Sequence, residues 1–199
     1  MWVVKIGGSL CDDPLLPQWL DLLATLGGGR VTVVSGGAGF ADEVRRAQRR
    51  WRFDDLAAHN MAVLAMVQFA YLMRALEPQL HAAACEADIR RVLKAGRTAL
   101  WVPFELQRDA PDADTHWGHT SDSIALDLAR HLNAERLVLV KSCPVDPAAS
   151  LDQLGELGIV DAQFATRSRQ ADFPIEVLPR ENLERMRGLL LGTVHPQGG

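Results

Sequence analysis

The chain is organised as short apolar runs separated by longer segments with apolar residues at helical spacing. Within these runs apolar and polar residues do not alternate, which is typical of strands in a sheet that helices cover on both faces. The pattern predicts an α/β fold, a three-layer αβα sandwich with a mainly parallel central sheet. The predicted strands cover residues 2–6, 30–35, 97–103, 135–141 and 173–178, with a short last strand in GTVHP at 192–196.

Helices are predicted between these strands from their apolar spacing and from the residues that begin and end them. Asp12, Asp13 and Pro14 open the first helix, and the glycines at 27–29 end it. Residues 104–119 are polar and have no period, which predicts a long loop of the kind that is often functional. The predicted helices cover residues 14–26, 41–52, 55–76, a shorter piece ending near 87, 120–133, two short segments within 148–170, and 179–190.

Composition and charge narrow the picture mainly by exclusion. The 199 residues show no internal repeat and no clear linker, so a single domain over 1–199 is expected. The formal net charge of −4 gives no electrostatic reason to expect nucleic acid or an anionic membrane as a partner. We expect neither an apolar run long enough to span a bilayer nor a secretory leader, and therefore a cytoplasmic protein. Cys11, Cys85 and Cys143 are widely spaced and odd in number, which predicts reduced thiols rather than disulfides or a zinc site.

Glycine-rich turns and scarce lysines meet at the exits of the predicted strands. Only three of the 21 basic residues are lysines, and two of them, Lys5 and Lys141, lie at strand ends, whereas Lys94 does not. Ligands of open parallel sheets bind beyond the carboxyl ends of the strands. Glycine lets backbone N–H groups approach phosphate oxygens, and lysine supplies a compact positive charge. The combination predicts a polyphosphate site, although each part alone is also explained by an ordinary turn or a solvated lysine. The turn residues concerned are Gly7, Gly8, Ser9, Gly36, Gly37 and Gly39.

Two nucleotide-binding motifs do not fit these turns. No Gly-Lys-Ser/Thr stands four residues after a glycine, so neither turn is a P-loop. The second turn begins like a dinucleotide fingerprint at Gly37 and Gly39, but position 42 is Asp where a third glycine is needed. The region about 20 residues further on is predicted to be helical rather than a strand ending in an acidic residue. A dehydrogenase of the Rossmann type is therefore disfavoured.

The order of four motifs resembles the amino acid kinase superfamily, which includes acetylglutamate kinase, aspartokinase, uridylate kinase and isopentenyl phosphate kinase. The motifs are VVKIGGSL, VVSGGAGFAD, TSDSIALDLA, and LVLVK with a following Asp, and they cover nearly the whole chain. Within the superfamily, the small size and the segments AHNMAVLAMVQFAYLM and WGHTSDSIALDLA are most similar to the aminomethylfuran phosphate kinases of methanofuran biosynthesis.

This resemblance implies an eight-stranded, mainly parallel sheet and transfer of the γ-phosphoryl group of ATP. Lys5 would bridge the donor and acceptor phosphoryl oxygens, and Lys141 would neutralise charge on the ATP side. Asp122 would orient the lysines, or hold Mg²⁺ through water, with the ion carried by the ATP phosphates and not by direct protein ligation. The resemblance also implies contacts to phosphate or acceptor from Gly7, Gly8, Ser9, Gly36, Gly37, Gly39, His59, Asn60, Thr120 and Ser121, and contacts to the nucleotide from Ser142 and Asp146.

The sequence departs from the superfamily pattern on the nucleotide side. Many members carry a Gly-x-x-x-Lys loop after the fourth strand region, but no lysine follows position 141 here. Lys141, Arg167 and Arg169 are the candidates to replace that lysine. The usual Asp-Gly-Val-Tyr is also replaced, by CPVDPAA, which puts the adenine pocket and the use of ATP in question.

Several other residues have a plain interpretation beside a functional one. His116 and His119 suit zinc or a phosphate contact, or are ordinary polar loop residues. His59 and Asn60 are partly buried polar residues of an apolar helix, or contact the acceptor. The arginines at 45–52 form a solvated face, or a flap that attracts an anionic substrate. The helix at 55–76 is apolar over more than one stripe, which predicts a homo-oligomer.

These patterns favour a Mg²⁺/ATP-dependent kinase acting on a small phosphate-bearing acceptor. For the subfamily it most resembles, the acceptor would be (5-aminomethylfuran-3-yl)methyl phosphate, converted to its diphosphate for methanofuran-type cofactors. One alternative is a carboxylate kinase that forms an acyl phosphate. Another is a non-catalytic nucleotide-binding or regulatory protein of the same fold.

Overall fold

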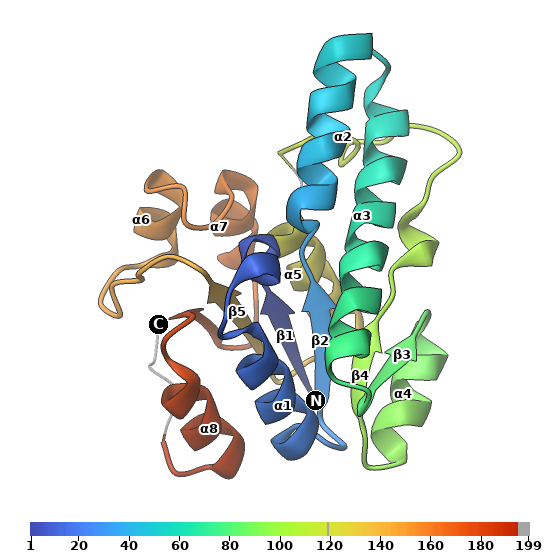
Figure 1. Ribbon diagram of the computed structural model, residues 1–199. Helices are drawn as coiled ribbons and strands as arrows, with labels where there is room; N and C mark the ends of the chain where they lie inside the picture. The colour runs from blue at the N-terminus through green and yellow to red at the C-terminus, as the bar shows by residue number, and fades with distance from the viewer. Residues whose placement is uncertain (119, 195–199) are drawn as a thin grey trace.

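The central feature of the fold is a six-stranded sheet in which every strand pairing is parallel. The computed structural model describes residues 1–118 and 120–194. The strand order is β3-β4-β2-β1-β5-β6 (Figure 1), which places the N-terminal strand in the interior of the sheet. The strands are β1 (Trp2–Ile6), β2 (Val31–Ser35), β3 (Leu80–Ala83), β4 (Thr98–Trp101), β5 (Arg136–Lys141) and β6 (Ile175–Pro179).

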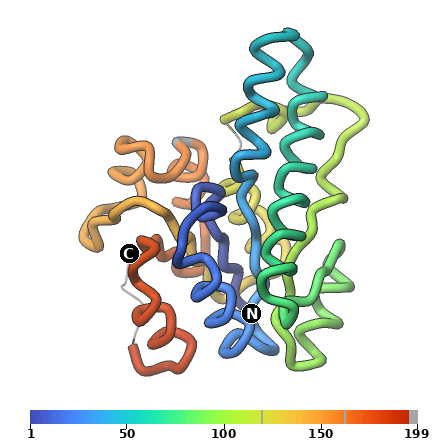
Figure 2. Tube along the Cα trace, viewed as in Figure 1, coloured from blue at the N-terminus to red at the C-terminus, as the bar shows by residue number. Residues whose placement is uncertain are grey.

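Helices cover both faces of this sheet and make the three-layer sandwich that the apolar runs predict. One face packs against α1, α3 and α8 around Trp19, Phe69 and Met73, and the other against α4, α5 and α7 around Leu126 and Phe164. The chain begins in the interior of the sheet and can be traced from there to the helices of both layers by its colour (Figure 2). The helices are η1 (Gly8–Asp12), α1 (Leu16–Leu26), α2 (Ala38–Trp51), α3 (Asp55–Leu76), α4 (Glu86–Lys94), η2 (Phe104–Leu106), α5 (Ser121–His131), α6 (Leu151–Glu156), α7 (Ala162–Ser168) and α8 (Leu183–Leu191).

The register of β1 decides which way Lys5 points. Successive side chains of a strand lie on opposite faces, and Val4 and Ile6 belong to the core on the α1–α3–α8 side. Val3 belongs to the opposite core, beneath α5, so Lys5 is directed to that face as well. Because Ile6 is aligned with Ser35 of β2 and Val140 of β5, the exits of β1, β2 and β5 lie side by side.

Three predicted elements are wrong in type or number. The shorter helical piece ending near 87 is instead β3, followed by α4, because Leu80 to Ala83 pair with Thr98 to Trp101 of β4. Helix propensity of the alanines in this stretch is overridden by that pairing. The resemblance implies eight strands, whereas residues 1–118 and 120–194 form a sheet of six. Residues 192–194 form no strand, and the rest of the predicted last strand, with His119 of the long loop, lies outside the described residues.

Helix boundaries also differ from the predicted ones. The chain first makes the short helix η1 after β1, and α1 begins at Leu16 rather than at residue 14. The helix predicted at 41–52 starts at Ala38, directly after the glycine turn, so that turn becomes a helix N-terminus. The last helix begins at Leu183 rather than at residue 179, because Pro179 is still part of β6 and pairs with Lys141.

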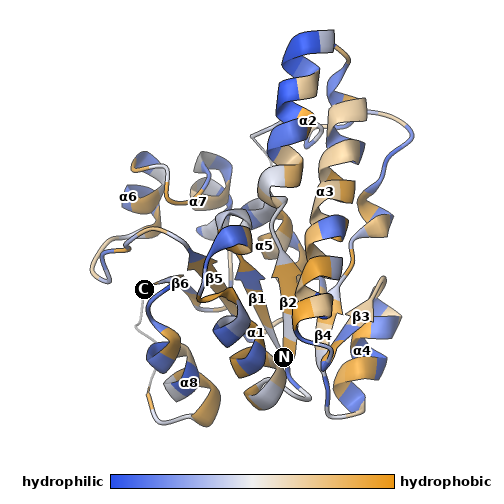
Figure 3. Ribbon diagram, viewed as in Figure 1, coloured by the Kyte–Doolittle hydropathy of each residue, from blue (hydrophilic) through white to orange (hydrophobic). Residues whose placement is uncertain are grey.

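The helices α2 and α3 form an arm that extends beyond the sheet (Figure 1), and α3 is its apolar member. The outer part of α2 is strongly hydrophilic beside the more apolar α3 (Figure 3). By length and composition α3 could cross a membrane, contrary to the expectation of no such run, but it packs against α2 and over β2, β3 and β4 as a core helix does. Met61, Leu64 and Tyr71 leave an exposed apolar stripe on it. That a second copy of the chain packs against this stripe stays a prediction. Light scattering tests it by measuring the molar mass of the protein in solution.

Candidate active site

Two buried lysines share one buried aspartate at the exits of β1 and β5. Nζ of Lys5 donates to Oδ1 of Asp122 at 2.7 Å, and Nζ of Lys141 donates to Oδ2 at 2.5 Å. Lys5 and Asp122 are each 3% exposed. The strands fix the two lysines, and the first turn of α5 brings the carboxylate between them. The residues expected to be catalytic are therefore in mutual contact.

The three charges of this cluster do not cancel. Burial opposes ionisation of Asp122, but the positive charges of Lys5 and Lys141 hold the pKa of its carboxyl below the ordinary value. Burial, followed by the positive charge of Lys5, lowers the pKa of Lys141. The two lysines and the carboxylate of Asp122 carry a net positive charge among themselves in a largely desolvated place, which the more distant negative charge of Asp161 reduces and which a bound anion would balance.

The two glycine turns pack directly against each other at this edge of the sheet. A Cβ at Gly36 would lie 2.5 Å from the amide nitrogen of Gly8, and a Cβ at Gly8 would lie 2.6 Å from that of Ala38. Ala38 itself begins α2 with a φ of 51°. Close backbone approach therefore accounts for these glycines independently of any ligand, whereas a Cβ at Gly39 would meet open space. Gly7 is also restricted, though less tightly, since its Cβ would lie 2.9 Å from the carbonyl oxygen of Val140.

The N-terminus of α5 is held by a residue that the sequence did not single out. Asp161 accepts hydrogen bonds from the hydroxyl of Thr120 at 2.5 Å and from that of Ser123 at 3.0 Å. It also caps α7, accepting from the amide of Phe164 at 2.5 Å. The only sequence signal was an aspartate in cap position before a short helix. Its position beside Thr120 depends on how α7 packs against α5, which no local pattern shows.

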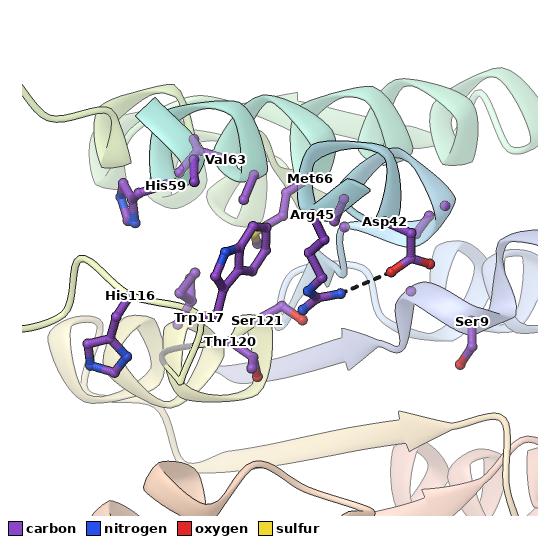
Figure 4. A pocket seen from close by; sticks show the side chains of 18 of the residues that line it. Ser9, Asp42, Arg45, His59, Val63, Met66, His116, Trp117, Thr120 and Ser121 are labelled. Carbon is purple, nitrogen blue, oxygen red and sulfur yellow. Dashed lines mark hydrogen bonds and ion pairs between the residues drawn. The ribbon is translucent and has the colours of Figure 1, made fainter. Parts of the chain in front are cut away.

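A cavity of about 530 Å³ opens beside these turns, between the α2–α3 arm and the long loop (Figure 4). Gly8, Gly37, Thr120 and Ser121 line it at the glycine turns and at the start of α5, whereas Lys5, Asp122 and Lys141 are not among its lining residues. Its outer walls come from α2, α3 and Trp117. The lining residues are Gly8, Ser9, Asp12, Gly37, Ala38, Gly39, Ala41, Asp42, Arg45, Asp55, Ala58, His59, Ala62, Val63, Met66, His116, Trp117, Thr120, Ser121 and Ile124.

One arginine of the basic run points into this cavity. Figure 4 shows the Trp117 indole beside Arg45, whose guanidinium carbon lies 4.4 Å from a ring centroid of that indole. Arg45 also donates to Asp42 at 3.0 Å, and the indole N–H of Trp117 donates to Gln48 at 2.6 Å. These contacts tie the long loop to α2. Arg45 therefore lies on the face of α2 that borders the cavity, whereas the other arginines of the run are not among the lining residues.

His59 and Asn60 both hold the long loop, in different ways. His59 lines the cavity, and its Nε2 lies 2.9 Å from the carbonyl oxygen of Leu106. Asn60 makes a reciprocal pair with the backbone of Arg108, with both hydrogen bonds at 2.8 Å. Asn60 is not among the lining residues of the cavity. The amide group of Asn60 therefore has an evident structural task at the base of the loop.

The residues expected on the nucleotide side lie in two places. The hydroxyl oxygen of Ser142 is 2.6 Å from that of Ser9, so it adjoins the first glycine turn. Asp146 lines a separate cavity of about 450 Å³, between the segment around residues 145–147 and 149–151, Leu154, Ser168, and β6 with its flanks. There its carboxylate accepts from the amide of Ala148 at 2.9 Å, which stabilises the turn.

The arginines considered as replacements for a second lysine are engaged elsewhere. Arg167 pairs with Asp127 at 2.6 Å, and Arg169 pairs with Asp152 at 2.9 Å. Lys141 is the candidate that reaches Asp122. His116 accepts from the amide of Gly118, and residues 1–118 and 120–194 contain no group of three or more His, Cys, Asp or Glu that could hold a metal ion.

The interior strand of this parallel sheet brings a buried lysine to glycine turns and helix N-termini. This arrangement is typical of α/β proteins that bind phosphate groups at the carboxyl ends of their strands. The comparison with protein families shows to which family of this class the chain belongs. Residues 1–144 match the model of the amino acid kinase family, and the chain belongs to that family.

Related proteins agree with this assignment. The chain is 26% identical over 141 residues to the [5-(aminomethyl)furan-3-yl]methyl phosphate kinase of Methanocaldococcus jannaschii. The match covers 70% of this chain and 64% of the relative, which is less than two thirds of the relative's length.

Among solved structures, the uridylate kinase of Archaeoglobus fulgidus is similar with a TM-score of 0.69 and 18% identity, covering 96% of this chain and 95% of the other. Isopentenyl phosphate kinase gives a TM-score of 0.59 and 15% identity, with 96% of each chain covered. These structures establish the fold.

Proposed function

We propose that the chain is an ATP-dependent kinase that transfers the γ-phosphoryl group to a phosphate group of a small-molecule acceptor. The observation that carries this proposal is the Lys5–Asp122–Lys141 cluster at the strand exits, because the two glycine turns and Ser121, the residue before Asp122, line the neighbouring cavity. The cluster offers excess positive charge but no activated nucleophile. Phosphoryl transfer needs this combination, since positioning and charge neutralisation supply most of its catalysis.

In the proposed reaction an oxygen of the acceptor phosphate attacks the γ-phosphorus while the bond to the β,γ-bridging oxygen breaks. The products are a diphosphate and ADP. Lys5 would contact the transferred group between donor and acceptor, and Lys141 would stabilise charge on the side of the leaving ADP. Both oxygens of Asp122 accept from the lysines, which favours the task of orienting them over that of binding a metal.

The site fits a Mg²⁺ ion that arrives with ATP. Mg²⁺ is commonly held by substrate phosphates with few or no direct protein ligands. The carboxylates nearest the lysines are already engaged, Asp122 by two lysines and Asp161 by two hydroxyls and an amide. When bound, the ion would neutralise phosphate charge, and Ser142 and Asp146 remain our predicted contacts on the nucleotide side.

The 530 Å³ cavity is the proposed acceptor site, and Arg45 is its proposed anchor for the acceptor phosphate. Among the described residues that line the cavity, Arg45 is the one lysine or arginine. Trp117 and Asp42 hold its guanidinium in place. Because the relative in Methanocaldococcus jannaschii is named for it, [5-(aminomethyl)furan-3-yl]methyl phosphate is the first acceptor to test.

Replacing Arg45 with methionine is expected to raise KM for a phosphorylated acceptor about 10- to 150-fold, because a charge-assisted hydrogen bond of about 1.5–3 kcal/mol is lost. The KM for ATP should change little. Arg46→Met is the matched control: Arg46 neighbours Arg45 on α2, its side chain is 71% exposed, and it pairs with Glu43 outside the cavity. Steady-state kinetics of both variants measure the difference. Equal KM values in the two variants would contradict the proposed anchor.

The proposed activity is tested by measuring ADP release with ATP, Mg²⁺ and a panel of acceptors. The panel holds the aminomethylfuran phosphate, UMP, isopentenyl phosphate, and carboxylates such as N-acetylglutamate and aspartate. ADP release with phosphomonoesters alone supports the proposal. A product trapped by hydroxylamine would indicate a carboxylate kinase instead. ATP binding without turnover of any acceptor would leave a nucleotide-binding protein of the same fold.

A further inference from the structure

Asp161 joins the N-termini of two helices that border the lysine cluster. Its carboxylate accepts from the hydroxyls of Thr120 and Ser123 in α5 and its cap, and from the amide of Phe164 in α7. Thr120 and Ser123 lie in the segment that presents Asp122 to the lysines. A single carboxylate thus sets how the start of α5 sits against α7.

The contact with Thr120 leads directly to Asp122. Thr120 is the N-cap of α5, and its hydroxyl oxygen accepts from the amide of Asp122 at 3.3 Å. Since the Thr120 hydroxyl donates its proton to Asp161, its lone pairs are left for the helix. The contacts therefore run from Asp161 through Thr120 to the backbone of Asp122. The carboxylate of Asp122 in turn contacts Lys5 and Lys141.

Asp161 also acts on Lys141 through its charge. The charged groups that influence Lys141 are Lys5 of β1, Asp122 of α5 and Asp161 before α7. Burial and Lys5 lower the pKa of Lys141, whereas the negative charges of Asp122 and Asp161 raise it. Asp122 is shared with Lys5, so Asp161 supplies additional negative charge that favours the protonated form of Lys141.

We propose that Asp161 is a positioning residue for phosphoryl transfer, which orients Asp122 through Thr120 and thereby the two lysines that Asp122 holds. This inference rests on the proposed kinase function for its catalytic part. The accompanying electrostatic part, the effect of the Asp161 charge on Lys141, concerns the protein alone and can be measured without turnover.

Asparagine at position 161 removes the negative charge and keeps part of the hydrogen bonding. The Oδ1 of Asp161→Asn can still accept from the Ser123 hydroxyl and the Phe164 amide, whereas its Nδ2, in place of Oδ2, would donate to the Thr120 hydroxyl instead of accepting from it. Asp152→Asn is the matched control, because Asp152 lies in the first turn of α6 and pairs with Arg169 at 2.9 Å, away from the lysines.

The three lysines make the titration of Lys141 directly observable. In protein labelled with ¹³C at Cε of lysine, three signals are expected, assigned by Lys94→Arg and Lys141→Arg. In Asp161→Asn the Lys141 signal should titrate at lower pH than in the unaltered protein, and in Asp152→Asn it should not move. The same titration in all three proteins would overturn the electrostatic part of the inference, whether or not the protein is a kinase.

Activity tests the catalytic part. In the unaltered kinase loss of kcat at high pH reports deprotonation of an essential group, and this limb should move to lower pH in Asp161→Asn. Asp161→Ala, which loses the hydrogen bonds to Thr120, Ser123 and Phe164 as well as the charge, should lower kcat about 10²-fold with KM for ATP less affected. A shifted Lys141 titration with unchanged kcat and pH profile would overturn the positioning role. Absence of turnover in the unaltered protein would instead refute the proposed function.

Discussion

Replacement of Lys5 by methionine should lower kcat about 10³-fold, because loss of one well-placed donor to a transition-state oxygen has an effect of that order. ATP binding should weaken much less, since most contacts of the nucleotide would lie on the other side of the transferred group. Methionine fills the buried space of the lysine stem without its charge. It leaves Asp122 paired with Lys141, so the fold should be retained. Steady-state kinetics and calorimetric titration with ATP measure the two effects separately.

Lys94 provides the control for this substitution. It lies in the last turn of α4, is exposed, and is the one lysine not expected in the site. Lys94→Met should retain the kcat of the unaltered protein. Near-normal kcat in Lys5→Met would show that the cluster is a structural ion pair and not the centre of phosphoryl transfer. A large loss of ATP affinity with little change of kcat would show that Lys5 contacts the nucleotide and not the transferred group.

The arrangement of β1, β2 and β5 was predictable because it depends on local signals that agree with one another. Each of these strands is a short apolar run followed by glycine or lysine, and parallel strands bring such exits to one edge of the sheet. The motifs that resemble the amino acid kinase superfamily added Asp122 to the two lysines. The structure brings these three residues together.

What the sequence left open depends on packing between distant segments. β3 was missed because its alanines favour a helix, and only the pairing with β4 makes the segment a strand. Asp161 was missed because its partners, Thr120 and Ser123, lie far back along the chain on another helix. The run of arginines did not show which of them faces the cavity, since that depends on how α2 packs against α3.

The glycine turns show how one residue type can satisfy two requirements. The sequence suggests bare backbone for contacts to phosphate, whereas the structure shows that Gly8 and Gly36 are also required where the two turns touch. A larger residue at either position would therefore disturb the fold as well as the site. Substitution of these glycines cannot separate the two effects, and the charged residues of the cluster are the better probes.

Removal of the Asp122 side chain, in Asp122→Ala, should abolish measurable turnover and destabilise the protein by about 3–5 kcal/mol at pH 7, the range found when one partner of a buried ion pair is removed. Lys5 and Lys141 would then face each other with little exposure to solvent and no shared carboxylate. Denaturant unfolding measures the change. Asp127→Ala is the control on the same helix: its ion pair with Arg167 is partly exposed, and its loss should cost less than about 1 kcal/mol.

The pH dependence of Asp122→Ala identifies the cause of the instability. In the unaltered protein the pKa of Asp122 is lowered, so its stabilisation is present above the ordinary pKa of an aspartate and is lost as pH falls through the folded value. Without Asp122, the folded state disfavours protonated lysines more strongly and binds fewer protons than the unfolded chain. Its deficit in unfolding free energy should therefore shrink as pH rises from 7 towards 10. Adding Lys141→Met to Asp122→Ala should restore part of the stability at pH 7, because it removes one of the two like charges. A deficit that is independent of pH and unrelieved by Lys141→Met would show that Asp122 stabilises α5 by packing and not by holding the two lysines.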